Sequence, residues 1–219
     1  MPHAMAPQTK MLRGFAQEII KAGFTHALLL GMGGSSLFAE VCRNLFGIAK
    51  GHLDLAVLDT TDPAAIRAHL QRCPPERLCV IVSSKSGTTA EVWALMRYFY
   101  AVFGKARRSP GDSWVAITDL GTPLEEQAKA WGFRRAFVHG PDSGMDVGGR
   151  FSALTYFGLA PAALLGVDLD SLLARARSML ETCGPARISA ENPALQLAAA
   201  LGTLGQSGRD KMTLLVSSG

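Results

Sequence analysis

The sequence predicts an α/β protein, a three-layer αβα sandwich around a five-stranded parallel sheet. Two observations indicate this fold. Short runs rich in Val, Ile and Leu alternate along the 219 residues with longer segments of helical periodicity. Apolar residues make up 48% of the chain and charged residues 18%, a balance typical of a folded domain with a sizeable core. Alternation of this kind implies right-handed crossovers that place helices on both faces of the sheet.

The expected elements follow in chain order. Strands are predicted at residues 26–30, 53–58, 77–83, 113–118 and 135–138, and helices at 9–22, 35–46, 63–70, 89–103, 122–131, 151–165, 169–182 and 192–206. A last apolar run, residues 212–216, is predicted to be one more strand. We expect residues 1–22 to form an N-terminal helix that is partly a cloning remnant, 23–150 the first α/β domain, 151–210 a helical connection, and 211–219 the first strand of a missing second domain.

Charge and cysteine content exclude several functional classes. The net charge of +4, from 22 basic and 18 acidic residues, comes without any Lys/Arg run, so we expect no nucleic-acid partner. The 17 uncharged residues after Arg150 include Gly158 and Pro161, which favours a buried helix over a membrane span. Four cysteines without C-x-x-C spacing and five scattered histidines predict no metal site and a reducing, cytoplasmic location.

The segment 83–89, Ser-Ser-Lys-Ser-Gly-Thr-Thr, follows a β-branched run and precedes a helical pattern. Free amides and the helix dipole favour an anion at such a helix start. Hydroxyls of Ser84, Ser86 and Thr89 add hydrogen bonds, Lys85 adds a charge, and Gly87 lets the backbone approach a ligand. Helix capping needs one hydroxyl rather than five. The segment therefore predicts a phosphate-binding loop.

A glycine-rich turn, Gly31-Met32-Gly33-Gly34-Ser35-Ser36, stands between another strand and helix. It is compatible with a dinucleotide-binding turn, but the third glycine of that fingerprint would fall at Ser36. The acidic residue expected about 20 residues on is displaced, since Asp59 lies 28 residues after Gly31. Two anion-binding turns at neighbouring strand ends suit one small phosphorylated ligand better than a dinucleotide.

A third motif, Asp146-Val147-Gly148-Gly149-Arg150-Phe151-Ser152, places an arginine at the start of an apolar segment. The glycine pair frees the backbone, and a guanidinium held at that position can meet a ligand oxygen. A surface arginine in a loop is the alternative interpretation.

Together the three motifs resemble the glucose-6-phosphate isomerase family, which has the flavodoxin-like sugar isomerase (SIS) fold. The resemblance extends from about Gly23 to the end of the chain. In particular, the chain is similar to the isomerase part of bacterial enzymes in which a transaldolase domain precedes the isomerase domain. It implies that Ser35, Ser84, Lys85, Ser86 and Thr89 clasp a sugar phosphate, over a backbone cradle that includes Gly33, Gly34 and Gly87. It further implies that Gly149 and Arg150 face the reacting carbons, with Arg150 stabilising an enediolate. Gly87 departs from the family, where many members carry an aromatic residue.

The resemblance implies an isomerase that interconverts glucose 6-phosphate and fructose 6-phosphate without a metal or cofactor, with a homodimer and a fused transaldolase domain as expected partners. The family's catalytic glutamate, and its ring-opening histidine and lysine, have no matching position in this chain, so we expect this segment to be inactive alone. Glu91, one turn into a helix, is predicted to be a helix-stabilising acid rather than the base. The alternatives are a non-catalytic phosphosugar-sensing module and a dinucleotide-dependent oxidoreductase.

Overall fold

The computed structural model describes residues 1–72, 75–104, 109–140, 147–185, 187 and 191–215. Five strands form one all-parallel sheet in the order β2-β1-β3-β4-β5. In chain order they are β1 (His26–Gly31), β2 (Asp54–Leu58), β3 (Leu78–Ser83), β4 (Trp114–Asp119) and β5 (Arg135–His139). The five strands predicted between residues 26 and 138 and the predicted fold class are confirmed.

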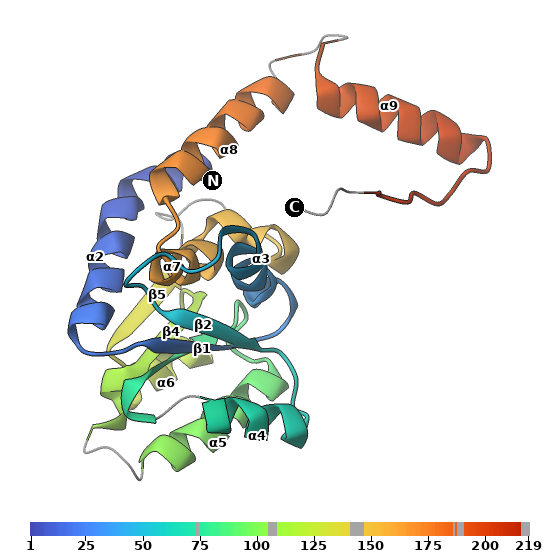
Figure 1. The fold of residues 1–219 in the computed structure, drawn as a ribbon. Helices are drawn as coiled ribbons and strands as arrows, with labels where there is room; N and C mark the ends of the chain where they lie inside the picture. Colours follow the sequence, from blue (N-terminus) through green and yellow to red (C-terminus); the bar gives the residue numbers. More distant parts are fainter. Residues whose placement is uncertain (73–74, 105–108, 141–146, 186, 188–190, 216–219) are drawn as a thin grey trace.

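Helices cover both faces of the sheet (Figure 1). On one face lie α2 (Thr9–Lys21), α3 (Leu37–Phe46) and α7 (Tyr156–Leu165), and on the other α4 (Pro63–Arg72), α5 (Ala90–Gly104) and α6 (Pro123–Ala130). Successive strand residues point to opposite faces, so Leu29 belongs to the first core and Leu28 and Leu30 to the second. Both cores are continuous along the sheet, which makes three layers.

The N-terminal helix and the segment after residue 150 belong to this body. Leu12 and Ile19 of α2 are fully buried, and every residue of α7 is buried in the same core. Helices α2 and α7 thus share one core with the sheet, as a parallel sheet that is covered on both faces requires. Within the described residues no helix is long and apolar enough to cross a bilayer.

The helix predicted at 151–165 begins later than expected. A 3₁₀ segment, Gly149–Leu154, comes first, and α7 starts at Tyr156. Thr155 separates the two: its hydroxyl donates to the Ser152 carbonyl at 2.7 Å and accepts from the Phe157 amide at 3.3 Å. Because Thr155 is the N-cap of α7, the α-helix begins after it, and residues 149–154 form a separate 3₁₀ segment.

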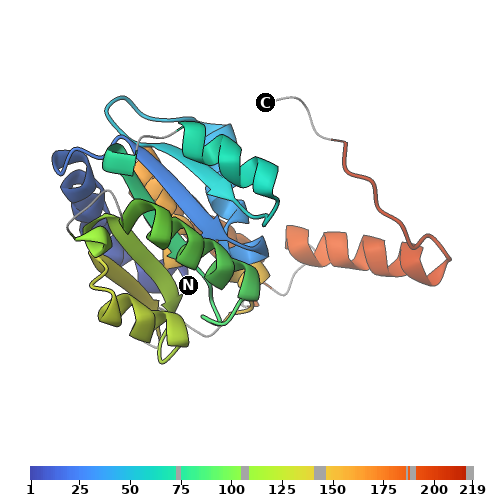
Figure 2. The same ribbon diagram turned by 90° about the horizontal axis from the view of Figure 1, so that it is seen from below.

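A helical arm extends from the body (Figures 1 and 2). It consists of α8 (Leu169–Cys183), whose first turns pack on the body through Leu169 and Leu173, and α9 (Pro193–Gln206). All residues of α9 are exposed. The strand expected at 212–216 does not form over residues 211–215, and residue 216 lies outside the described part. A strand needs a neighbour for its backbone groups, and no described strand pairs with this segment.

Candidate functional site

The three predicted motifs meet at the carboxyl ends of β1 and β3. The strand order 2-1-3-4-5 places β2 on one side of β1 and β3 on the other, so the chain reverses its direction across the sheet between β1 and β3. Open α/β sheets bind ligands in the crevice at such a switch point. The first motif follows β1 as the β1–α3 turn (residues 32–36), and the second follows β3 as the β3–α5 loop (residues 84–89).

One hydrogen bond joins the β1–α3 turn to the end of β3. The hydroxyl of Ser83, which is fully buried, donates to the carbonyl oxygen of Ser35 at 2.7 Å. The Ser35 side chain is itself buried beside it. A buried hydroxyl bond of this kind fixes the turn relative to the sheet, because breaking it would leave an unsatisfied polar group. Ser83 therefore supports the site, a role that the sequence did not assign.

The third motif contacts the first through backbone atoms. A Cβ added to Gly34 would lie 2.1 Å from the carbonyl oxygen of Gly149, so only glycine fits there. The buried Ser152 hydroxyl is within hydrogen-bond distance of two carbonyl oxygens, that of Gly149 at 2.7 Å and that of Gly34 at 3.2 Å. Gly34 and Gly149 thus lie together, as the resemblance implies for the turns around one ligand.

The β3–α5 loop gathers its hydroxyls at the start of α5. Ser84 is buried and its hydroxyl is hydrogen-bonded to that of Thr89 at 3.0 Å. The exposed Ser86 accepts from the Thr88 amide at 3.3 Å and the Thr88 hydroxyl at 3.0 Å. The first helical residue is Ala90, and the opening amides of a helix have no acceptor inside it. Several hydroxyls therefore lie together beside the opening amides of α5.

Lys85 makes an ion pair that the sequence did not predict. Its ammonium lies 2.5 Å from a carboxylate oxygen of Asp119, the last residue of β4, and both side chains are largely buried. The other oxygen of Asp119 is buried without a hydrogen-bond partner among the described residues. The charge of Lys85 is thus compensated within the chain.

Gly87 has a conformation and a neighbour that explain its identity. Its φ of +64° lies in the left-handed region, and an added Cβ would lie 2.6 Å from the Cβ of Thr122. The indole of Trp93 donates to its carbonyl oxygen at 2.7 Å. Thr122 therefore occupies space that a larger side chain at position 87 would need.

Arg150 lies on the rim of the site, within a 3₁₀ segment rather than at the head of an α-helix. It is exposed, and its guanidinium stacks on the Phe151 ring, 4.8 Å from the ring centroid. It borders a hollow of about 240 Å³ whose lining is Gly33, Gly34, Leu37, Phe38, Val41, Gly149, Arg150 and Ala153. Glu91 is exposed in the first turn of α5, consistent with a helix-stabilising acid.

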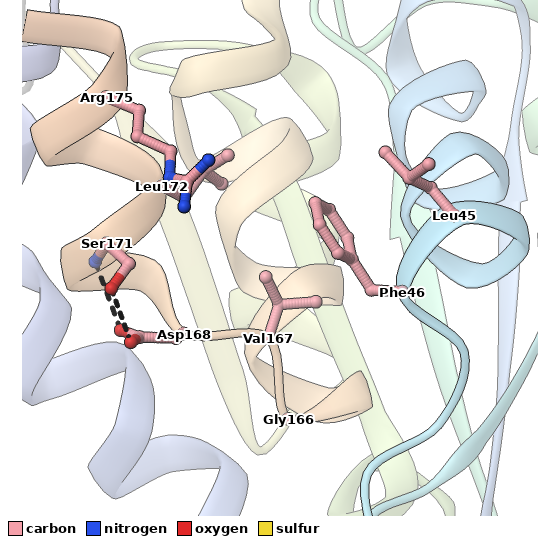
Figure 3. A pocket seen from close by; sticks show the side chains of 8 residues that line it. All are labelled: Leu45, Phe46, Gly166, Val167, Asp168, Ser171, Leu172 and Arg175. Carbon is pink, nitrogen blue, oxygen red and sulfur yellow. Dashed lines mark hydrogen bonds between the residues drawn. The ribbon is translucent and has the colours of Figure 1, made fainter. Parts of the chain in front are cut away.

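A larger hollow of about 530 Å³ lies at the other end of α3, beside the turn from α7 to α8 (Figure 3). Apolar side chains such as Phe46, Val167 and Leu172 form most of its lining. Its one carboxylate, Asp168, is engaged in capping α8, and hydrogen bonds from Ser171 lower the pKa of this group. None of the predicted site residues lines this hollow, so it is separate from the site at β1 and β3.

Comparison with known proteins agrees with this geometry. The family described as phosphoglucose isomerase matches residues 8–209. The chain belongs to the phosphoglucose isomerase family. A glucose-6-phosphate isomerase from Synechococcus sp. (strain JA-3-3Ab) is 34% identical over 196 residues, 88% of this chain and 36% of that protein. A probable glucose-6-phosphate isomerase from Natronomonas pharaonis is 37% identical over 171 residues, 76% of this chain and 36% of that protein.

Solved structures show the same fold. A hypothetical protein from Thermus thermophilus superposes with a TM-score of 0.75 at 32% identity, covering 91% of this chain and 46% of that one. A glucose-6-phosphate isomerase from Chlamydia trachomatis gives a TM-score of 0.68 at 22% identity, covering 93% of this chain and 38% of that one. This phosphoglucose isomerase family chain spans 36% of the length of each of the two isomerases from Synechococcus and Natronomonas.

Proposed function

We propose that this chain forms the sugar-phosphate-binding part of an isomerase that interconverts glucose 6-phosphate and fructose 6-phosphate through an enediolate. The observation that carries the proposal is the convergence of three separate motifs at the β1/β3 switch point, joined by the Ser83–Ser35 and Ser152–Gly34 hydrogen bonds. Family membership supports the substrate class.

In this proposal the phosphate lies over the start of α5. The hydroxyls of Ser84, Ser86 and Thr89 and that of Ser35 donate to it, with Lys85 in the same loop and the backbone at Gly33, Gly34 and Gly87 forming the cradle. Hydrogen bonds from neutral donors to an ionised group are about twice as strong as neutral pairs. On binding, bonds to phosphate replace the hydrogen bond between the Ser84 and Thr89 hydroxyls.

In the same proposal, Gly149 and Arg150 face the sugar carbons. The guanidinium of Arg150 is exposed and has no ion-pair partner among the residues that the structure describes. A fixed cation of this kind stabilises an oxyanion as it develops. In an isomerase assembled around this chain, we expect Arg150→Ala to lower turnover by about 10²–10³ and to change the Michaelis constant much less.

One observation favours a second candidate, a phosphosugar-sensing module that binds without catalysis. Isomerisation needs a carboxylate base near the reacting carbons. Among the described residues around the cradle, Asp119 is committed to Lys85 and Glu91 is exposed on α5. We infer that the 219-residue chain binds phosphosugar without turning it over. A coupled assay with fructose 6-phosphate checks this, since robust turnover would make Glu91 the leading base.

Calorimetry with fructose 6-phosphate tests the binding site. We expect the double variant Ser84→Ala/Thr89→Ala to bind about 1–3 kcal/mol more weakly, given about 1–1.5 kcal/mol for each lost hydrogen bond to an anion. Because the two hydroxyls bond to each other in the free chain, removing both leaves no unpaired partner. Ser178→Ala/Thr182→Ala on α8 is a matched control, since it removes the same two residue types away from the site. Equal affinity of both double variants and the wild type would refute the site.

A reducing, cytoplasmic setting and a homodimer complete the proposal. Cys42 and Cys183 are free thiols, which supports a reducing compartment. The exposed leucines of α9 support contact with further protein. Light scattering of the purified chain over a wide range of concentrations tests the dimer.

A further inference from the structure

We propose that the Lys85 side chain acts as a positioning residue rather than as a phosphate ligand, and that Asp119 is its partner in this role. The Lys85–Asp119 pair fastens the β3–α5 loop to β4 and carries no net charge toward the ligand. The inference rests on the proposed phosphate site and concerns which groups in it attract the anion. Hydroxyls and helix amides, rather than an ammonium, supply the attraction.

The direction of the Lys85 side chain is the first argument. The crevice lies between β1 and β3, and Ser35 is held on that side by Ser83. β4 lies on the opposite side of β3, and its last residue, Asp119, takes the Lys85 ammonium at 2.5 Å. The ammonium is therefore engaged on the side of β3 that faces away from the β1–α3 turn.

The backbone gives a second argument. The parallel ladder between β3 and β4 continues past the end of β3, because the Ser84 amide donates to the Ile117 carbonyl at 3.0 Å and the Asp119 amide donates to the Lys85 carbonyl at 3.2 Å. Lys85 is thus joined to Asp119 by backbone and side chain together. Two linkages between the same pair of residues restrain a loop more than either alone.

The third argument is electrostatic. A carboxylate this close to an anion-binding loop would repel the ligand if it were not compensated. The Lys85 ammonium compensates Asp119, so the pair adds little net field. The opening amides of α5 and the Ser and Thr hydroxyls are sufficient for anion binding in themselves. On this view, losing Lys85 harms binding chiefly because it exposes the charge of Asp119.

A cycle of variants tests this with fructose 6-phosphate and calorimetry. We expect Lys85→Met to weaken binding on the order of tenfold, because it leaves an uncompensated carboxylate near the phosphate. Asp119→Asn should bind at least as well as the wild type, because the uncompensated Lys85 charge attracts the anion and offsets the looser loop. The double variant Lys85→Met/Asp119→Asn should return to within about threefold of the wild type, since the pair is again without net charge. Lys129→Met and Glu126→Gln on α6 control for the same changes in total charge.

The opposite pattern would overturn the proposal. If the ammonium contacts phosphate, Asp119→Asn should weaken binding by leaving Lys85 unplaced. The double variant should then stay about tenfold or more weaker than the wild type.

Hydrogen exchange of residues 84–89 gives a test that needs no ligand. We expect both single variants to exchange these amides faster than the wild type, while residues 26–31 of β1 are unchanged. Equal exchange in all variants would show that the pair fastens nothing and would overturn the proposal. Failure of the wild type to bind fructose 6-phosphate would refute the phosphate site, and exchange would still judge the pair.

Discussion

The α/β body and the α9 arm contain similar apolar residues in opposite circumstances. In the body, Leu29 of β1 is fully buried in the core on the α2, α3 and α7 face of the sheet, whereas Leu201 of α9 is 39% exposed and every residue of α9 is exposed. Strand β1 and helix α9 both lack Asp, Glu, Lys and Arg, and both are rich in leucine or alanine. The difference shows that apolar composition stabilises a fold only where a second layer removes it from water.

The largest contrast is expected from leucine truncation. Leu29→Ala should lower the free energy of unfolding by about 2–5 kcal/mol, because it opens a cavity in a packed core. Leu201→Ala should change it by less than about 0.5 kcal/mol, because an exposed side chain leaves no cavity. Urea unfolding followed by circular dichroism measures both. A large effect of Leu201→Ala would mean that α9 is covered in solution.

Glycine replacement sharpens the comparison at the backbone. Gly34→Ala should cost about 1–3 kcal/mol of unfolding free energy, because the new methyl group meets the Gly149 carbonyl at 2.1 Å. Gly202 of α9 has nothing within 4 Å of an added Cβ. Gly202→Ala should therefore leave the unfolding midpoint unchanged or raise it, since alanine favours helix by up to about 1 kcal/mol. Gly34→Ala should also weaken fructose 6-phosphate binding, whereas Gly202→Ala should not.

Removal of the N-cap side chains of α8 and α9 should affect stability differently. Asp168 accepts from the Asp170 and Ser171 amides at the start of α8, and Asn192 accepts from the Ala194 and Leu195 amides at the start of α9. Asp168→Ala should cost about 1 kcal/mol of global stability, since α8 packs on the body. Asn192→Ala should loosen α9 and its connection to α8, because the Asn192 amide also donates to the Gly184 and Arg187 carbonyls. Amide exchange in 193–206 should then rise while the urea midpoint stays constant.

The smallest effect concerns pH. Hydrogen bonds from Arg134, together with those from Arg135 on β5, lower the pKa of Glu18 on α2 below its ordinary value. A carboxylate whose pKa is lowered by folding adds stability that is present above its unfolded pKa and is lost as pH falls through the folded value. We expect the urea midpoint of the wild type to fall between about pH 5 and pH 3, and less steeply in Glu18→Gln. Parallel pH profiles of the two proteins would contradict this.

Much of the body could be predicted from sequence. The predicted strand 26–30 matches β1, because a buried apolar run ended by glycine has few alternatives in a parallel sheet. The hydroxyl-rich segment 84–89 lies between β3 and α5, as its position after an apolar run predicts, and its phosphate binding stays a prediction. Asp119 was missed because its partner is 34 residues away and a lone acid at a strand end carries no local signal.

The segment that follows α9 shows where prediction from sequence fails. The run 212–216 has the composition of a strand, but strand formation depends on a neighbour, which composition does not reveal. The same applies to α2 and α7, whose places in the body were set by tertiary packing. Local patterns identified the elements, and only the sheet decided which of them are covered.

The Ser152–Gly34 hydrogen bond spans 118 residues, which bears on the order in which the protein is made. The chain leaves the ribosome from its N-terminus, and β1 to β5 are complete by residue 139. The β1–α3 turn must then wait for Gly149–Ser152 before its final contacts exist. Contacts between residues so distant along the chain form slowly. A nascent chain that ends before Gly149 therefore lacks both these contacts and α7, whose buried residues cover one face of the sheet.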